Sequence, residues 1–333
     1  MPSPVVLAPE SKKSSAPPLE VELPSPPSPH PNDVSSAWIL RPGGRPLFIF
    51  AHQDDETVLA GIISRIVGDD RCGTFTWWTN GDGLAPLTGE SPQAYAKIRM
   101  AEAEEAMRRL GAQPHRKRDL GSSEIENYRR FTHVAAGGQL RQAALHYFLA
   151  EAERVERVIR EANPDRVFLL AWQGGHPEHD LTHLMTARAV KKLRQETGRP
   201  IPIIQCPAYE YVILCALRFN PWFDGDRRRI ELTPEERQKK RAVFDAYPSQ
   251  QELFRRFEQV VKVVAKFSAL RGRPVDVESY LGVEEFGVVD PELDYTRSTH
   301  RAEALNYIND DFEGIKIRFD TMIRPIAELL LFP

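Results

Sequence analysis

Short apolar runs alternate along the chain with longer segments in which apolar residues recur at helical spacing. Compact apolar runs, typical of buried strands, occupy residues 46–51, 74–79 and 166–171. Helical spacing is found over about 54–67, 92–110, 139–163 and 179–194. Strands that alternate with helices predict a Rossmann-like α/β fold, in which helices cover both faces of a mainly parallel sheet.

The second half of the chain continues this pattern less regularly. Two apolar segments within 200–224 are expected to be strands that close the sheet. Thr233 begins a capping-box pattern, which predicts the start of a helix. Residues 290–333 carry mixed helical signals that we could connect to no chemistry.

Residues 1–36 differ from the rest in composition. They hold ten of the 27 prolines and eight serines, and they contain no Phe, Tyr or Trp. Such a segment buries too little apolar surface to offset the entropy of ordering it, so we expect a disordered tail. The remaining residues, 37–333, are expected to form one catalytic domain with a C-terminal extension.

Composition and charge narrow the class of protein. Apolar residues make up 41% of the chain, and 44 basic against 47 acidic side chains leave a net charge of −3. This balance provides no positive field for phosphates, so nucleic acid is not an expected partner. No apolar run reaches the roughly 20 residues that span a bilayer. With Cys72, Cys206 and Cys215 expected to be reduced, buried thiols, we expect a cytoplasmic protein.

Two polar segments follow predicted strands and carry the candidate chemistry. His52 and Asp55 lie three residues apart after the first strand, and His176 and His179 lie three apart after the strand at 166–171. The carboxyl ends of parallel strands are where ligands bind in such sheets. Two imidazoles and a carboxylate around an open position are typical of catalytic zinc.

The same residues also have simpler interpretations. Asp54 and Asp55 suit the N-terminus of a helix, where they could act as caps. His176 could be a loop residue that precedes a helix. His183 lies four residues after His179 on one helical face, which is metal-ligand spacing, but a packed or solvated helix residue shows the same spacing.

The two polar segments resemble the motifs of a known family. Ala-His-Gln-Asp-Asp-Glu at 51–56 is similar to the Ala-His-Pro-Asp-Asp-Glu motif of the N-acetylglucosaminyl-phosphatidylinositol deacetylase (PIG-L, LmbE-like) superfamily. His-Pro-Glu-His at 176–179 resembles its His-Pro-Asp-His motif. Weaker similarities are found at Arg99 and Glu102 before Leu110-Gly111, at residues 79–83, and at Ser249-Gln250. The resemblance covers about residues 45–290.

The resemblance implies a role for each motif residue. His52, Asp55 and His179 would bind the metal, expected to be Zn²⁺ although another divalent ion would suit the same ligands. Asp54 would be the general base that takes a proton from the attacking water. His176 would stabilise the oxyanion or protonate the leaving amine. A base and an acid on opposite sides of the scissile amide are what hydrolysis requires.

Two further residues are implied to contact substrate. Arg99 would bind sugar hydroxyls or a phosphate, with a surface pair to Glu102 as the alternative interpretation. Glu124 stands where the family often has an aspartate that faces the sugar.

The chain departs from the family pattern at three other positions. Gln53 replaces a proline, which loosens the turn without removing a ligand. Glu178 replaces the aspartate between the two histidines and is not expected to be a ligand. Gly174 stands where some members carry a tyrosine. Any stabilisation of the oxyanion that this tyrosine provides is therefore either supplied by another residue or absent here.

The resulting hypothesis is a zinc-dependent deacetylase that acts on a small N-acetylated amino sugar or a conjugate of one. An amidase that cleaves a larger acyl group or a thiol conjugate is the first alternative. A sugar-binding protein without turnover is the second, but a metal held for structure alone needs no free carboxylate such as Asp54 beside it. The oligomeric state is left open.

Deletion of residues 1–36 is predicted to leave folding and activity nearly unchanged, because the tail lacks the apolar content to dock. The melting temperatures of the full and truncated chains check this prediction. A fall of many degrees would show that the tail packs on the domain.

Overall fold

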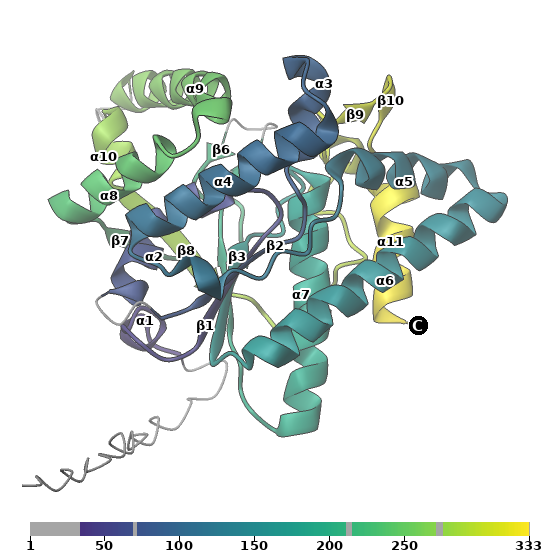
Figure 1. The fold of residues 1–333 in the computed structure, drawn as a ribbon, viewed down its shortest axis with the longest axis horizontal. Coiled ribbons are helices and arrows are strands. Elements are labelled where there is room, and N and C mark those ends of the chain that lie inside the picture. The colour runs from purple at the N-terminus through teal and green to yellow at the C-terminus, as the bar shows by residue number, and fades with distance from the viewer. Residues whose placement is uncertain (1–33, 69–71, 211–214, 271–275, 333) are drawn as a thin grey trace, which may run out of the picture.

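The sheet that organises the fold has six strands in the order β2-β1-β3-β4-β8-β7 (Figure 1). In this computed structural model the described residues are 34–68, 72–210, 215–270 and 276–332. The parallel strands are β1 (Pro46–Phe50), β2 (Thr74–Trp77), β3 (Arg166–Leu170) and β4 (Ile203–Cys206). Two antiparallel strands, β8 (Val283–Val288) and β7 (Arg228–Glu231), complete the sheet. The mainly parallel α/β fold is therefore confirmed.

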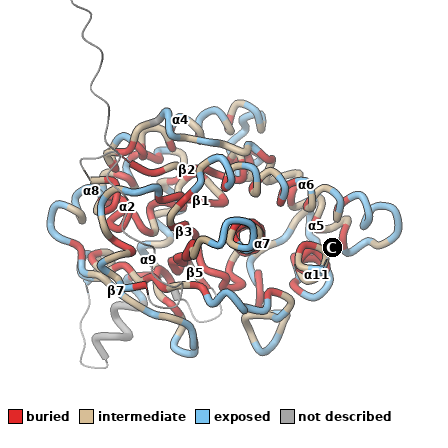
Figure 2. The backbone as a smooth tube through the Cα atoms, turned by 90° about the horizontal axis from the view of Figure 1, so that it is seen from below, coloured by how far each residue is buried: buried red, intermediate tan, exposed pale blue. Residues whose placement is uncertain are grey.

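Alternation along the central strands divides the core into two layers. Leu47 and Ile49 of β1 face one hydrophobic cluster, whereas Phe48 and Phe50 face the other. Successive side chains of a strand point to opposite faces, so a strand that is apolar throughout must be covered on both. All five residues of β1 are buried, and Figure 2 shows the buried backbone concentrated in the sheet and in the helices against it.

Helices cover both faces. On one side lie α5 (Glu124–Ala136), α6 (Gly138–Ala162), α7 (Pro177–Thr197) and α11 (Arg324–Leu331). On the other lie α1 (Ser36–Ile39), α2 (Ala60–Val67), α4 (Pro92–Leu110) and α8 (Pro234–Phe244). The remaining described helical elements are the long helix α9 (Gln251–Leu270) and several short ones. The short ones are η2 (Asp55–Thr57), η3 (Asp82–Leu84), α3 (Ala85–Thr88), η4 (Pro114–Arg116), η5 (Pro248–Gln250), α10 (Val277–Leu281), η6 (Glu303–Leu305) and η7 (Phe319–Ile323).

Several local signals in the sequence act as expected. Helix α4 ends at Gly111, whose φ of 86° is a left-handed conformation that glycine adopts at little cost. Thr233 forms a capping box with Glu236 at the start of α8. The segment expected as one helix from Asp54 is instead a short 3-10 turn followed by α2, because the chain bends at Leu59.

One strand prediction is wrong. Residues 200–224 were expected to supply two strands of the sheet, but among their described residues β4 alone joins it. Residues 211–214 of the second predicted strand lie outside the described part of the chain. Pro207 follows β4 and has no N–H with which to extend the ladder. After it, β5 (Tyr209–Glu210) pairs with β6 (Cys215–Ala216) in a separate hairpin, and β8 takes the place beside β4.

The N-terminal tail lies largely outside the described residues, which begin at Val34. Val34 is buried, and its carbonyl oxygen accepts a hydrogen bond from Arg228. Ser35 caps α1 by accepting from the backbone N–H of Trp38 at 3.2 Å. A truncation after residue 33 would keep these contacts, whereas one after residue 36 removes them, so we expect unchanged stability only of the truncation after residue 33.

Residues of the C-terminal segment pack on the sheet layer rather than trailing away from it. Tyr295, Tyr307, Phe319 and Ile326 are buried in the cluster that contains Leu47 and Ile49. The short hairpin of β9 (Asp311–Phe312) and β10 (Ile315–Lys316) lies near α5 (Figure 1). Among the described helices, we find none with both the length and the apolar character that a bilayer crossing requires.

Cys72 and Cys206 are buried, as expected, and the side chain of Cys215 lies outside the described part of the chain.

A buried carboxylate from a distant strand holds the start of α2. Glu284 of β8 accepts hydrogen bonds from the backbone N–H groups of Gly61 and Ile62, at 2.9 and 2.8 Å. Lys240 of α8 donates to the same carboxylate at 2.7 Å. A negative charge is favourable at a helix N-terminus, and burial makes each of these groups costly to leave unpaired.

Glu284→Ala is predicted to lower the free energy of unfolding by about 3–5 kcal/mol, because it leaves the Lys240 ammonium buried without its partner. Urea denaturation measures the change. The matched control is Glu278→Ala, which breaks the exposed pair with Arg241 and should cost no more than about 1 kcal/mol. Equal effects of the two changes would show that the buried pair has no special importance.

Candidate metal centre and active site

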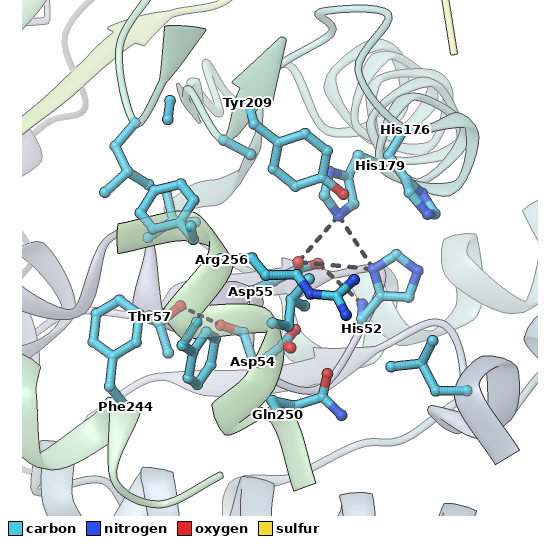
Figure 3. Close-up of a pocket in the computed structure, with 18 of the residues that line it drawn as sticks. His52, Asp54, Asp55, Thr57, His176, His179, Tyr209, Phe244, Gln250 and Arg256 are labelled. Atoms are coloured by element: carbon cyan, nitrogen blue, oxygen red, sulfur yellow. Dashed lines mark hydrogen bonds and ion pairs between the residues drawn. The ribbon is translucent and has the colours of Figure 1, made fainter. Parts of the chain in front are cut away.

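A cavity of about 470 Å³ opens at the carboxyl ends of the parallel strands. His52 and Asp55 reach it from the segment after β1, and His176 and His179 reach it from the segment after β3 (Figure 3). The two motifs, more than a hundred residues apart in sequence, therefore meet as expected, because β1 and β3 are adjacent parallel strands.

The turn after β1 is closed by Asp55. Its Oδ2 atom accepts hydrogen bonds from the backbone N–H groups of Ala51 and His52, both at 3.0 Å. Its other oxygen, Oδ1, is left to face the cavity, where it lies 3.1 Å from His179 Nε2. One carboxylate thus shapes the turn and also faces the opposite motif.

Asp54 sits in a strained backbone conformation. Its φ of 118° is far from the usual range of a residue with a side chain, and such conformations cost about 1–3 kcal/mol. The carbonyl oxygen of Asp54 accepts from both the N–H and the hydroxyl of Thr57, at 2.9 and 2.6 Å, which holds the strain. The carboxylates of Asp54 and Asp55 consequently point in different directions, and Asp54 pairs with Arg99 at 3.1 Å.

Three side-chain atoms form a compact triangle. His52 Nδ1 lies 3.1 Å from His179 Nε2, His179 Nε2 lies 3.1 Å from Asp55 Oδ1, and His52 Nδ1 lies 3.8 Å from Asp55 Oδ1. Ligands of a tetrahedral zinc ion, each about 2.0–2.1 Å from it, are about 3.3 Å apart. The triangle has the size and the donor atoms that such an ion requires, with its open side towards the cavity.

Other sets of potential ligands fit less well. His176 also has a ring nitrogen within 4.8 Å of nitrogens of His52 and His179, but both of its nitrogens already have partners in the protein. His52, Glu124 and Glu178 form another trio within 4.8 Å. In that trio Glu178 is already bonded to His52 and to Asn127.

Glu178 contacts a residue of the triangle, which we did not predict from the sequence. Its Oε2 lies 2.8 Å from His52 Nε2, and its Oε1 accepts from Asn127 at 2.6 Å. Tyr147 donates to the same Asn127 at 2.8 Å. A carboxylate on the far nitrogen of a metal-binding histidine fixes the ring and its tautomer, so Glu178 orients His52 towards the triangle. In the sequence, its position between the candidate residues His176 and His179 was the one feature that could have indicated this contact.

The electrostatics of the triangle favour a positive charge at its centre. Burial disfavours a charged His52, but Glu124, Asp55 and Glu178 together raise its pKa well above the ordinary 6.5. Burial would likewise raise the pKa of Asp55, yet His179 and His52 hold it well below its usual range. Buried carboxylates that stabilise a cation in this way match the chemistry of a divalent metal ion.

Asp54 differs from its neighbour in its proton affinity. Burial raises the pKa of Asp54 to about 7, with Asp55 adding to the rise and Arg99 opposing it. Neighbouring titratable groups whose environments drive their pKa values apart are typical of a site that gives them different acid-base roles.

Tyr128 and Asp310 hold the ring of His176 in place. The hydroxyl of Tyr128 lies 3.0 Å from His176 Nε2 and donates to Asp310 at 3.0 Å. His176 Nδ1 accepts from the backbone N–H of Glu178 at 3.3 Å. Burial, followed by the charges of His52 and His179, lowers the pKa of His176 well below the ordinary 6.5.

Asp310 and Tyr128 were not found from the sequence. Burial raises the pKa of Asp310 to about 7, an effect that its hydrogen bond from Tyr128 opposes. No local motif marks either residue, and Asp310 comes from the C-terminal segment to which we had assigned no chemistry.

The loop before His176 is fixed by the same C-terminal segment. Asp180 accepts from the backbone N–H groups of Gln173 and Gly174, both at 3.0 Å, and Tyr307 donates to it at 2.7 Å. Gly174 has a φ of 72°, and a Cβ there would collide with the side chains of Thr299 and Asn306. A tyrosine therefore has no room at this position, which accounts for the departure from the family pattern.

Arg99 and Glu124 line the cavity, as expected of residues near a substrate. Arg99 also donates to Glu102 at 3.4 Å, but both side chains are buried, so the alternative of a surface pair is wrong. Glu124 accepts from the hydroxyl of Thr79 at 3.2 Å. Gln250, the second residue of the downstream pair, lines the same cavity.

His183 lies away from the candidate centre. Its Nδ1 lies 2.9 Å from the carbonyl oxygen of Leu170, and its Nε2 lies 3.1 Å from the hydroxyl of Tyr295. Both nitrogens are thus satisfied in the core, which leaves none for a metal.

Comparison with known proteins bears on this arrangement. Residues 47–190, which include every candidate ligand, match the family model described as PIG-L, GlcNAc-PI de-N-acetylase. The 1D-myo-inositol 2-acetamido-2-deoxy-alpha-D-glucopyranoside deacetylase of Kineococcus radiotolerans is 31% identical over 178 residues, which cover 48% of each chain. The deacetylase of the same name from Segniliparus rotundus is 30% identical over 177 residues, covering 46% of this chain and 52% of the relative.

The chain spans about half the length of these curated relatives. Among solved structures, a deacetylase of the teicoplanin biosynthesis pathway aligns with 74% of this chain and 99% of its own, with a TM-score of 0.50 at 18% identity, which shows a shared fold. The similarity in sequence to the PIG-L family is therefore found over residues 47–190 of this chain.

Proposed function

We propose that this protein is a metal-dependent hydrolase that removes an acetyl group from the nitrogen of an amino sugar or a sugar conjugate. The triangle of His52, Asp55 and His179, with Asp54 beside it in the same cavity, is the observation that carries the proposal. The names of the curated relatives, which specify an acetamido sugar, support the choice of substrate class.

The donor set of two imidazoles and a carboxylate fits Zn²⁺, although another divalent ion would suit it as well. When bound, such an ion would supply a Lewis acid that polarises the amide carbonyl and eases deprotonation of water. Glu178 and the backbone N–H groups that bond Asp55 keep the ligands oriented.

Asp54 takes a proton from the attacking water. Its raised pKa of about 7 matches a base that works near neutral pH, and Arg99 holds its carboxylate in place. The strained backbone of Asp54 turns this carboxylate away from Asp55, so that one group binds and the other accepts the proton.

His176 acts on the opposite side of the amide. At rest it is neutral, because burial and the two neighbouring histidines lower its pKa. Negative charge that develops on the amide oxygen would favour the protonated imidazole, so that His176 takes up a proton from solvent in the cavity. The resulting imidazolium would stabilise that oxygen and pass the proton to the leaving amine. Tyr128 and Asp310 keep the ring in position for this transfer.

Two other functions remain as alternatives. An amidase that removes a larger acyl group would use the same residues on a different substrate. A sugar-binding protein without turnover is less favoured, because it has no use for a base such as Asp54. Release of acetate from a panel of N-acetylated sugars, with the bound metal identified in parallel, distinguishes these functions. Metal content without any turnover would favour the binding protein.

His52→Ala and His179→Ala are each predicted to lose most of the bound metal, because each removes one corner of the ligand triangle. Metal analysis of the purified variants measures this loss. The matched control is His183→Gln, at a histidine whose nitrogens bond to Leu170 and Tyr295, and it should retain its metal. A His183 variant without metal beside a fully loaded His179 variant would contradict the ligand assignment.

Asp54→Asn is predicted to fold, to retain its metal and to lose turnover by about 10²–10⁴-fold, because it keeps the shape of the side chain and removes its basicity. Substrate binding should change much less. The measurements are kcat, KM and metal content.

Asp55→Asn serves as the comparison, and it should weaken metal retention instead. An Asp54→Asn protein with near-normal turnover would remove the base assignment, and one that lost its metal would show that the two aspartates exchange roles.

A further inference from the structure

The cavity is polar at one end and apolar at the other. The ligand triangle, Arg99 and Glu124 lie at the polar end. The apolar wall comes from separate parts of the chain and includes Val58, Leu217, Phe244, Leu253, Phe257 and Val260. Figure 3 shows Phe244 on the side of Asp54 and Thr57, away from the histidines. A site that binds sugar hydroxyls alone has no need of such a wall.

Helix α9 presents its apolar residues to the cavity. Phe254 anchors the helix by packing edge-on against Phe244, with ring centroids 4.8 Å apart. Leu253, Phe257 and Val260 follow at helical spacing and line the cavity. Leu253 remains 47% exposed there, and Phe257 and Val260 are partly exposed. Exposed apolar side chains grouped at a cavity indicate a ligand that covers them.

The polar groups near this wall are largely committed to the protein. The Gln250 amide nitrogen donates to Tyr95 at 2.8 Å and to Ser249 at 3.1 Å. Glu210 accepts from Gln173 and Asn220. Arg256 of α9 also lines the cavity, with its Nε bonded to Glu252 at 3.2 Å. A hydroxyl placed against the apolar wall itself would lose its hydrogen bonds to water without replacement.

We infer that the substrate carries an alkyl or aryl group attached to the amino sugar, and that this group lies against α8 and α9 while the amide lies at the ligand triangle. The inference rests on the proposed function and narrows its substrate. It also separates this chain from the curated relatives, whose names specify an inositol on the sugar. The apolar group can be joined through the glycosidic oxygen or through the acyl carbonyl, and the experiment distinguishes these attachments.

The test compares kcat/KM for four compounds below their micellar concentrations. They are N-acetylglucosamine, its inositol glycoside, its octyl glycoside and N-octanoylglucosamine, each followed by release of the free amine or of the carboxylic acid. An alkyl compound should be preferred, mainly through a lower KM, by up to about fourfold for each methylene that reaches the wall. Preference for the octyl glycoside assigns the wall to the aglycone. Preference for N-octanoylglucosamine assigns the wall to the acyl chain and replaces the proposed deacetylase with the amidase that removes a larger acyl group.

A matched pair of variants on α9 locates the effect. Val260→Ser alters the wall, whereas Val263→Ser makes the same change at a residue of the same helix that is 41% exposed outside the cavity. The first should reduce the preference for the alkyl compound over N-acetylglucosamine by about threefold or more, and the second should leave that ratio at the wild-type value. Equal ratios in both variants would overturn the inference.

The remaining outcomes separate the inference from the proposed function. If N-acetylglucosamine or its inositol glycoside is hydrolysed as well as the alkyl compounds, the inference fails and the proposed function stands. If no compound is hydrolysed, the proposed function fails, and calorimetric titration with octyl glucoside decides the inference. Saturable binding that is weakened by Val260→Ser but not by Val263→Ser supports an apolar subsite, and no binding overturns it.

Discussion

The arrangement of the site depends on one repeated interaction, in which a carboxylate accepts hydrogen bonds from two consecutive backbone N–H groups. Asp55 holds Ala51 and His52 in this way, and Asp180 holds Gln173 and Gly174. Each of these carboxylates fixes the conformation of a loop directly after a parallel strand, where the hydrogen bonds of the sheet no longer hold the backbone. Without these two carboxylates, the side chains that they aim at the cavity would have no common geometry, because loops on their own are mobile.

Because of this geometry, neighbouring residues of the same type face different partners. Asp55 is bonded and directed to the triangle, whereas Asp54 is forced into a positive φ and turned aside to Arg99. His179 faces the triangle, whereas His176 is drawn back to Tyr128. In both motifs a short distance along the chain separates side chains of the same type into different surroundings, and the backbone makes the difference.

The sequence was sufficient for the parallel part of the sheet and for the meeting of the two motifs, since apolar runs and strand ends are local features. It was insufficient where a contact joins distant segments. Nothing near Asp310 marks it as a partner of Tyr128, and nothing near Glu284 marks it as a cap for α2. The strand error at 200–224 has a similar cause, because β-strand propensity does not specify which edge a strand will join.

The bond from Glu284 to the start of α2 has a consequence for how the protein is made. Helix α2 follows the turn that carries His52 and Asp55, yet its N-terminus is completed by a residue more than 220 positions later in the chain. Asp310 joins the site later still. During synthesis the surroundings of the first motif are incomplete until Asp310 has emerged, so the nascent chain carries the candidate metal ligands well before it can hold them in place.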